Sequence, residues 1–353
     1  MQRDIIVIGG SAGSLGAVKS ILQVLPKGLP ITVFVVIHLS PDYPSALPLL
    51  LTNAGPFRAT SPKDQESIQQ AHIYVAPPDH HITIEAGKIR VLRGPRENRH
   101  RPAIDPLFRS AAREFGPRVI GIVLSGLRDD GSAGLYAIKK RGGITIVQDP
   151  GESPWHDMPR NAIQYADPHF IWRAEEIGRN LPNLAELSER TAAMSKSSSN
   201  GRRTNRKKSP RGSAEPVELQ KQEANMATAW PAEGEGTPSV FACPECHGVL
   251  WELKDDKMVR FRCRVGHSYS EASLTQEMSV ASENALWAAV RALEEKAALQ
   301  RRVAEGMGHD RRMGSRLLDQ SESHAANARL IRDMIFRRDA ELETEQAEER
   351  KAS

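Results

Sequence analysis

The sequence predicts a three-layer, doubly wound α/β domain with a mostly parallel sheet, followed by smaller parts. Short Val/Ile-rich runs alternate with helical patterns from residue 4 to about 175. The runs are nearly continuous in apolar residues, as over 31–37, which is typical of strands buried on both faces. A parallel sheet covered by helices on both sides accounts for both observations.

The elements follow from these patterns in chain order. Strands are expected over 4–9, 31–38, 72–76, 81–84, 88–92, 118–124, 143–148 and 169–172. Helices are expected near 14–25, 43–53, 105–115, 132–141 and 158–165.

Beyond this region the composition changes twice. Residues 191–238 are rich in Ser, Lys/Arg, Pro and Gly, with too few large apolar side chains to offset the entropy of folding, so we expect a disordered basic linker. Residues 239–274 hold every cysteine, and 275–353 carry apolar positions at helical spacing, interrupted at 306–310. The predicted domains are thus 1–190, 191–238, 239–274 and a helical hairpin or coiled-coil tail over 275–353.

Charge and apolar content limit the location and the partners. The formal net charge is +4, but six basic residues lie within 202–211, and removing them leaves −2. Nucleic acid is therefore not an expected partner, because the folded parts carry no basic excess. No apolar run is long enough to span a bilayer, and no signal-peptide pattern precedes the first strand, so we expect a cytoplasmic chain without membrane insertion.

The first candidate site residue is Ser11. The first strand runs into Gly9-Gly10-Ser11-Ala12-Gly13, which fits the G-x-S-x-G nucleophile elbow, and a helical pattern follows. The alternative is a nucleotide-binding phosphate loop over residues 9–16. That alternative is weaker, because Ser11 occupies the place of a required glycine. Asp42 is near the place expected for an acidic ribose partner, but it lies beyond an inserted His38.

Two further strands end in candidate partners for the serine. His38 follows the second apolar strand, and Asp130 follows the strand at 118–124. Serine, histidine and aspartate could thus meet at one sheet edge as a catalytic triad. The alternatives are a structural histidine and an aspartate that caps the helix at 132–141, a role open equally to Asp129.

Several motifs occur in order and together resemble the catalytic domain of the chemotaxis methylesterase CheB. The resemblance covers roughly residues 3–185. It rests on Ile8 to Gly13, Val36 to His38, Tyr74 to His81, Asn98 to Pro102, Leu124 to Gly131 and Met158 to Arg160.

The resemblance implies a fold, an activity and roles for residues. Ser11 would be the nucleophile, His38 the base and Asp130 the acid, without a catalytic cofactor. The implied reaction is hydrolysis of glutamate γ-methyl esters on cytoplasmic segments of methyl-accepting chemoreceptors, with deamidation of receptor glutamines as a side activity. Backbone amides near the nucleophile turn and around Leu127 would hold the oxyanion.

Arg99 and Arg101 are expected near the cleft. Their cations could orient an acidic receptor segment. The alternative is that both pair with local acids and cap a loop. We therefore take Arg99, Arg101 and Leu127 as candidate substrate-binding residues.

The sequence departs from the family pattern in ways that concern rate and control. Ala12 stands where members often carry threonine, and Leu127-Arg128 replaces Met-Gly. The catalytic pattern begins almost at Met1, so we expect no receiver domain before it. The alternatives are constitutive activity, control by a separate response-regulator receiver in a phosphorelay, and control by the C-terminal half. A regulatory scaffold without enzymatic activity is the rival to the hydrolase.

The cysteines predict a structural zinc site. Cys243 and Cys246 form one close pair, Cys263 and His267 form another, and a hairpin around 250–262 would join them. This spacing is typical of a closed tetrahedral Cys₃His zinc-ribbon-like site. His247 is an alternative fourth ligand, although its adjacency to Cys246 is unfavourable for chelation.

Overall fold

The computed structural model describes residues 3–39, 45–186, 236–255, 258–306 and 311–352. These residues belong to two compact units, Met1–Leu274 and Thr275–Ser353. Both the α/β part and the cysteine-containing part lie in the first unit. Most of the expected linker, residues 191–235, lies outside the described residues.

The centre of the first unit is a seven-stranded sheet in which every pairing is parallel. The spatial order is β10-β9-β8-β1-β2-β5-β3. The bounds are β1 Ile5–Gly10, β2 Thr32–Ile37, β3 Arg58–Thr60, β5 His72–Val75, β8 Val119–Val123, β9 Ile144–Gln148 and β10 Phe170–Trp172. The chain leaves β1 for β2 on one side and later returns to place β8 on the other, which makes a switch point at β1.

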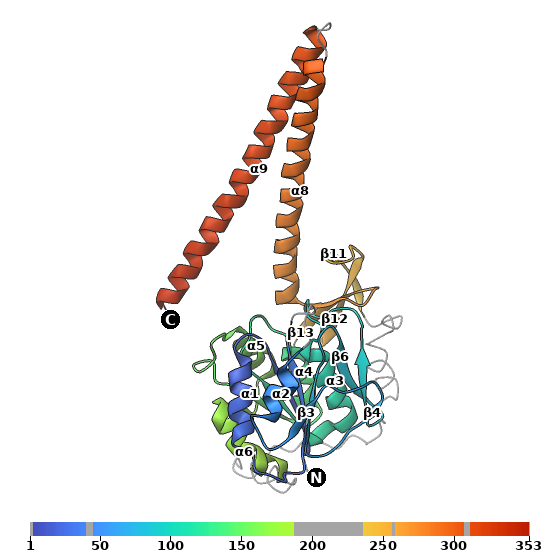
Figure 1. The fold of residues 1–353 in the computed structure, drawn as a ribbon, viewed down its shortest axis with the longest axis vertical. Coiled ribbons are helices and arrows are strands. Elements are labelled where there is room, and N and C mark those ends of the chain that lie inside the picture. The colour runs from blue at the N-terminus through green and yellow to red at the C-terminus, as the bar shows by residue number, and fades with distance from the viewer. Residues whose placement is uncertain (1–2, 40–44, 187–235, 256–257, 307–310, 353) are drawn as a thin grey trace, which may run out of the picture. The chain divides into compact units, whose positions relative to one another are not determined.

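Helices cover both faces of this sheet (Figure 1). On one face lie α1 Ser14–Gln23, α2 Leu47–Thr52 and α6 Ala174–Glu186. On the other lie α3 Ile104–Phe115, α4 Ser132–Lys140 and α5 Asp157–Ala166, with a short 3-10 turn at Gly116–Arg118 after α3. Every residue of β1 and β2 is buried, because each strand faces a helical layer on both sides. The expected three-layer α/β fold is confirmed.

Two smaller antiparallel sheets complete the strands of the first unit. One has the order β4-β7-β6, with β4 Glu66–Ser67, β6 His81–Glu85 and β7 Lys88–Leu92. The other has the order β11-β12-β13-β14, with β11 Thr237–Ala242, β12 Val249–Asp255, β13 Met258–Cys263 and β14 Ser268–Ser270. The pairing of β12 with β13 is the hairpin that the cysteine spacing requires.

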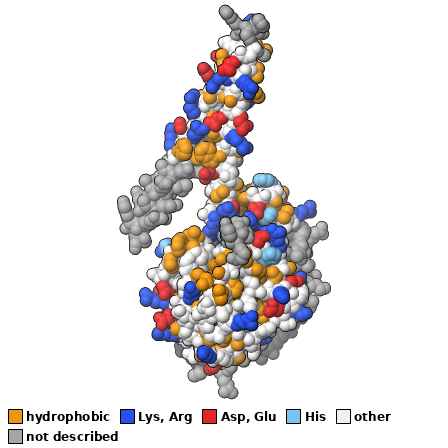
Figure 2. Space-filling view, in the orientation of Figure 1, with side chains coloured by type: hydrophobic (Ala, Val, Ile, Leu, Met, Phe, Trp, Pro, Cys, Tyr) orange, Lys and Arg blue, Asp and Glu red, His pale blue; other side chains and the backbone are white. Residues whose placement is uncertain are grey.

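The second unit contains two long helices, α8 and α9. The helix α8 spans Glu271–Gly306, entering this unit at Thr275, and α9 spans Arg311–Ala352. They pack against each other, since Ser321 Oγ donates to Ala297 O (2.8 Å) and the rings of Trp287 and Phe336 meet edge to face. Lys/Arg and Asp/Glu side chains are interspersed along the visible face of this hairpin (Figure 2).

Among the described helices, none combines the length and the apolar character that crossing a membrane requires.

The eight expected strands and five expected helices of the α/β part are all present, with ends shifted by at most a few residues. The expectation missed the short strands β3 and β4 and the helix α6. The helix α6 contains Pro182 in its interior and is amphipathic, with buried Ile177, Leu181 and Leu184 on one side. Packing of this apolar side against α1 stabilises a helix that local propensity disfavours.

Two helical glycines should respond oppositely to substitution by alanine. A Cβ at Gly178 would lie 2.5 Å from Ile21 O and 3.0 Å from Ile21 Cα, so α1 and α6 would have to separate. We expect Gly178→Ala to lower the free energy of unfolding by about 1–3 kcal/mol. Gly16 has no atom near its Cβ direction, and Gly16→Ala should raise that free energy by about 0.5–1 kcal/mol.

Thermal unfolding followed by tryptophan fluorescence measures both changes. Gly16→Ala is the matched control, because it adds the same methyl group to a helix of the same layer. Equal melting temperatures for the two variants would contradict the close approach of α1 and α6.

Candidate active site

The parallel register places Ser11 and His38 next to each other. Gly10 pairs with Ile37, so the following residue of each strand leaves the sheet at the same edge. The His38 N–H also donates to Gly10 O (3.2 Å). Neighbouring strands are about 4.8 Å apart, which brings the two side chains within reach of each other.

The turn that carries Ser11 is shaped by glycines. Gly13, which precedes α1, has φ 75°, a backbone conformation that residues other than glycine rarely adopt. The Ser11 N–H donates to Ser125 O (2.9 Å), which fixes the turn against the loop after β8. In that loop a Cβ at Gly126 would lie 2.8 Å from Ser11 Cβ, so the loop passes directly beside the candidate nucleophile.

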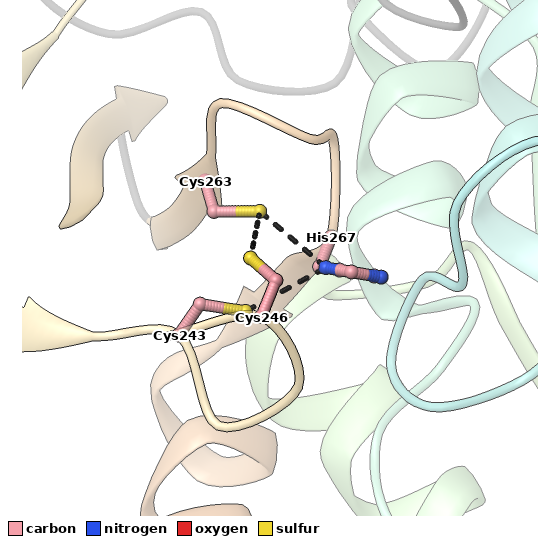
Figure 3. A group of neighbouring side chains, drawn as sticks. All are labelled: Cys243, Cys246, Cys263 and His267. Atoms are coloured by element: carbon pink, nitrogen blue, oxygen red, sulfur yellow. Dashed lines mark hydrogen bonds between the residues drawn. The ribbon is translucent and has the colours of Figure 1, made fainter. Parts of the chain in front are cut away.

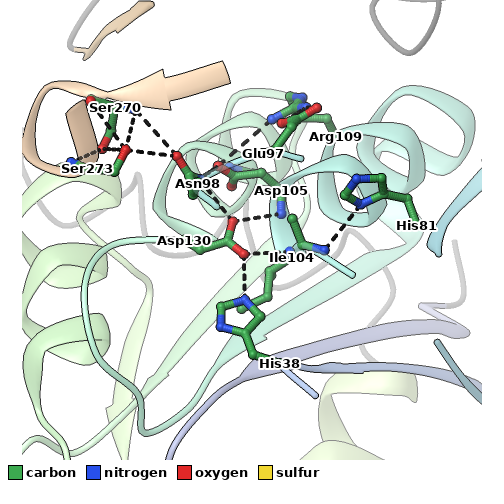
Figure 4. Close-up of polar contacts among 12 residues, drawn as sticks. His38, His81, Glu97, Asn98, Ile104, Asp105, Arg109, Asp130, Ser270 and Ser273 are labelled. Carbon is green, nitrogen blue, oxygen red and sulfur yellow. Dashed lines mark hydrogen bonds and ion pairs between the residues drawn. The ribbon is translucent and has the colours of Figure 1, made fainter. Parts of the chain in front are cut away.

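The imidazole of His38 is held by Asp130. Its Nε2 lies 2.8 Å from Asp130 Oδ2, and the two side chains are 6% and 1% exposed (Figure 4). Because a carboxylate only accepts hydrogen bonds, Nε2 carries the proton and Nδ1 keeps its lone pair. Nδ1 is buried without a hydrogen-bond partner among the described residues. The Ser11 hydroxyl therefore does not bond to it here, and such contacts often close only when substrate binds.

Asp130 is an ionised buried carboxylate surrounded by donors. Oδ2 accepts from Ile104 N–H (2.8 Å), and Oδ1 accepts from Asn98 Nδ2 (3.1 Å) and Asp105 N–H (3.3 Å). Ile104 and Asp105 begin α3, where unpaired amides and the helix dipole favour negative charge. Burial raises the pKa of Asp130, but the bonds from His38 and Ile104 outweigh burial and hold this pKa below its usual range.

Asp129 has different surroundings although it is adjacent. Its side chain is buried, and neither oxygen has a hydrogen-bond partner among the described residues. Burial raises the pKa of Asp129, and Ser270, which lies beside it without reaching hydrogen-bond geometry, opposes this in part. Of these two aspartates, Asp130 alone bonds to His38, which distinguishes two residues that chain position alone leaves equivalent.

A second histidine covers the imidazole of His38. The ring of His100 is stacked on it, with centroids 3.5 Å apart and planes 8° apart. Burial, followed by the nearby His38, lowers the pKa of His100 to about 3. His100 is therefore neutral and cannot supply a second positive charge beside the triad. His81 is also buried and bonds Pro95 O and Ala103 N–H, a structural role.

The candidate substrate-binding residues have diverse surroundings. Arg101 donates to Asp79 (2.8 Å) and Gly94 O (2.7 Å), which is the local pairing considered as its alternative role. Arg99 adopts a left-handed backbone, φ 69°, on the same loop. Leu127 is 47% exposed in the loop beside Ser11, and the amide before it, Gly126 N–H, is bonded to Trp155 O (2.9 Å).

The four predicted metal ligands lie together at the end of the four-stranded sheet β11-β12-β13-β14 (Figure 3). Their ligand atoms are all within 4.8 Å of one another: Cys243 Sγ, Cys246 Sγ, Cys263 Sγ and His267 Nδ1. Cys246 Sγ and Cys263 Sγ are 3.5 Å apart, and His267 Nδ1 is 3.6 and 3.5 Å from the sulfurs of Cys243 and Cys263. Tetrahedral zinc at ordinary bond lengths separates such atoms by about 3.5–3.8 Å, so these residues fit the ion.

The residues around these candidate ligands are also compatible with metal binding. His267 Nε2 lies 3.3 Å from Glu245 Oε2, so a carboxylate can fix the ring with Nδ1 turned inward. The Tyr269 hydroxyl lies 3.6 Å from Cys243 Sγ. His247 is not among the four grouped residues.

Comparisons with known proteins identify the family of the chain. A family described as CheB methylesterase matches residues 6–181. A Leptospira interrogans protein is 35% identical over 178 residues, which are 50% of this chain and 92% of that protein. The chain belongs to the CheB methylesterase family.

Two other relatives of this CheB-family chain are matched over only about half of their own length. The Methanospirillum hungatei protein-glutamate methylesterase/protein-glutamine glutaminase 2 is 36% identical over 183 residues, 52% of each chain. The Yersinia pestis protein-glutamate methylesterase/protein-glutamine glutaminase is 30% identical over 191 residues, 53% of this chain and 54% of that protein. The chain thus spans about half the length of these two relatives.

A solved structure has the same fold as the α/β part. The Thermotoga maritima CheB methylesterase catalytic domain superposes with a TM-score of 0.50 and 27% identity, covering 52% of this chain and all of that domain.

Sequence reasoning assigned no role to Asn98, which donates to Asp130 from a loop outside the sheet. Its only sequence signal was its place in a family motif, which carries no information about its partners.

The stacked histidines predict a pH dependence of stability. The unfolded chain protonates His100 below about pH 6.5, whereas the folded chain resists until about pH 3. Unfolding therefore takes up a proton in this window, and stability falls as the pH falls through it. Between pH 7 and 5 this loss is at most about 2 kcal/mol.

We expect His100→Gln to lose less stability than the unsubstituted chain between pH 7 and 5, measured by chemical unfolding at both pH values. Near-UV circular dichroism at pH 7 checks that the variant keeps its packing. The same loss in both proteins would contradict a buried neutral His100.

The metal ligands predict zinc binding. We expect about one zinc ion per purified chain, measured by elemental analysis, and its loss in Cys246→Ser because thiolates dominate the affinity of such sites. His247→Asn is the matched control, since asparagine tolerates the left-handed backbone of that residue, φ 59°. Zinc lost from the control and retained by Cys246→Ser would overturn this ligand set.

Proposed function

We propose that the chain is a protein-glutamate methylesterase that hydrolyses glutamate γ-methyl esters on chemoreceptors. The observation that carries the proposal is the buried contact between His38 Nε2 and Asp130 Oδ2 beside Ser11, at the carboxyl ends of β1, β2 and β8. The names of the relatives support the substrate class.

The proposed mechanism uses the chain's own groups. Ser11 Oγ attacks the ester carbonyl while its proton passes to His38 Nδ1, and Asp130 stabilises the resulting imidazolium. The imidazolium then protonates methoxide, methanol leaves, and an acyl-enzyme remains. Water, deprotonated by the same imidazole, hydrolyses it to glutamate and free Ser11. A glutamine side chain would give the same acyl-enzyme with ammonia as the leaving group.

Backbone amides are proposed to hold the oxyanion. The amide of Gly126 is bonded to Trp155 O, so the next amide in that loop, Leu127, and the turn after Ser11 are the candidates. Arg99 is the proposed contact for an acidic receptor segment. Arg101 is instead proposed to stabilise this loop, because its guanidinium group donates hydrogen bonds to Asp79 and Gly94 O.

The other parts of the proposal concern setting and control. Receptor segments of this class are cytoplasmic, so the reaction is placed in the cytoplasm. The group Cys243, Cys246, Cys263 and His267 is proposed to hold a structural zinc without a part in bond cleavage. A separate response-regulator receiver is a proposed partner for control.

Methanol release from methylated chemoreceptor tests the activity. We expect Ser11→Ala and His38→Ala to lower kcat by about ten-thousandfold or more, since both take part in proton transfer. Asp130→Asn should lower kcat by about ten-thousandfold, because an amide cannot stabilise the imidazolium.

Asp129→Asn is the matched control. It changes the neighbouring buried carboxyl, which does not contact His38, and should retain activity within about tenfold. Equal losses for the two aspartate variants would contradict the assigned triad. No methanol from any form, with the fold intact, would favour the rival interpretation as a regulatory scaffold.

A further inference from the structure

The Cys/His module, residues 236–274, contacts the loop that supports Asp130. Ser268 O accepts from the backbone N–H of Asn98 (2.9 Å), and Ser268 also pairs with Glu97 in an isolated bridge. A Cβ at Gly266 would lie 2.8 Å from Pro95 Cγ, so the backbone of Gly266 passes close to the ring of Pro95. All these residues belong to one compact unit.

The side chain of Asn98 joins the module to the triad (Figure 4). Its Oδ1 accepts from Ser273 Oγ (3.1 Å) and Ser270 N–H (3.4 Å), both in the module. Its Nδ2 donates to Asp130 Oδ1 (3.1 Å) and Asp105 Oδ2 (3.2 Å). One amide thus bonds serines on one side and the catalytic acid on the other.

Chemistry fixes the orientation of this amide. A backbone N–H can only donate and an ionised carboxylate can only accept, so oxygen must face Ser270 and nitrogen must face Asp130. Asn98 is 7% exposed, and its backbone is left-handed, φ 48°, which asparagine tolerates and most residues do not. Such a conformation persists where surrounding contacts determine it.

The metal ligands and the serines are adjacent in the chain. His267 directly precedes β14, and Cys263 ends β13, so an ion that binds both ligands closes the β13–β14 turn. The Cys263 N–H donates to His267 O (3.0 Å) within this turn, and Ser268 pairs with Arg262 beyond it. Closure of the turn therefore sets the position of Ser270 and Ser273 relative to Asn98.

We propose that Asn98 is a positioning residue for Asp130 and that the metal-loaded module, through Ser270 and Ser273, holds Asn98 in place. The inference rests on the proposed function, since it concerns the same triad. It makes the module a part of the active site, so that metal loading sets the rate at which Ser11 reacts. Asn98 touches neither substrate nor the reacting atoms and acts through Asp130.

The test measures the nucleophile directly and does not depend on a receptor substrate. Full-length protein with measured zinc content is treated with a fluorophosphonate, and the rate of Ser11 labelling is followed by mass spectrometry. The double variant Ser270→Ala/Ser273→Ala loses the Ser273 hydroxyl that donates to Asn98 and the Ser270 hydroxyl that bonds to the Ser273 hydroxyl, while the Ser270 N–H remains. We expect it to label about five- to tenfold more slowly. Ser239→Ala is the matched control, because its hydroxyl donates within the module to Leu250 O (2.8 Å).

Chelation supplies the second arm. Removing zinc should slow labelling of the unsubstituted protein by a similar factor, and adding zinc back should restore it. The same chelation should change the double serine variant by less than about twofold, because perturbations that act through one contact are not additive. Asn98→Asp keeps an acceptor for Ser273 but loses the donor to Asp130, and should slow labelling at least as much as the double variant.

The outcomes separate the two proposals. On receptor substrate, positioning predicts that kcat falls while KM is unchanged. Zinc-dependent labelling without methanol release would support the positioning role and contradict the proposed substrate. If methanol is released but the labelling rate depends neither on zinc nor on the two serines, the positioning role alone is overturned. Faster labelling after chelation would also overturn it, since it would mean that the module obstructs Ser11.

Discussion

The buried negative charge of Asp130 is the constraint on which the site depends. An isolated carboxylate in a protein interior is strongly unfavourable, so its donors must come from the fold itself. Here they come from the start of α3, from Asn98 and from His38. A single carboxyl group therefore holds α3, the loop before it and the end of β2 in one arrangement, and it fixes the orientation of the His38 imidazole.

The strands of the α/β part were predictable because burial on both faces requires a continuous run of apolar residues in the sequence. The run 31–37, for example, is apolar except for Thr32, and Pro30 and His38 flank it. The helix α6 was harder to predict, because Pro182 is typical of a helix break and the packing partner α1 is distant in the chain. The strands β3 and β4 are too short to show a period.

The sequence could predict only those site residues whose position in the chain indicates their role. Strand ends indicated Ser11 and His38, and a family motif indicated Asp130 over Asp129, whereas the physical distinction between the aspartates is their donors. Nothing local could have revealed the bond between Asn98 and Ser273, which lie 175 positions apart. The Cys/His group could be predicted from spacing because both of its residue pairs are local in sequence. The contacts of the module with the rest of the chain could not be predicted in this way.

The register of β1 and β2 has a consequence for redesign. Ser11 and His38 each stand one position beyond the same paired residues, Gly10 and Ile37. Side chains alternate along a strand, so inserting one residue into either strand would turn Ser11 or His38 to the opposite layer. A transplanted site would therefore have to carry both strands at their present lengths, together with the glycine-containing turn that follows β1.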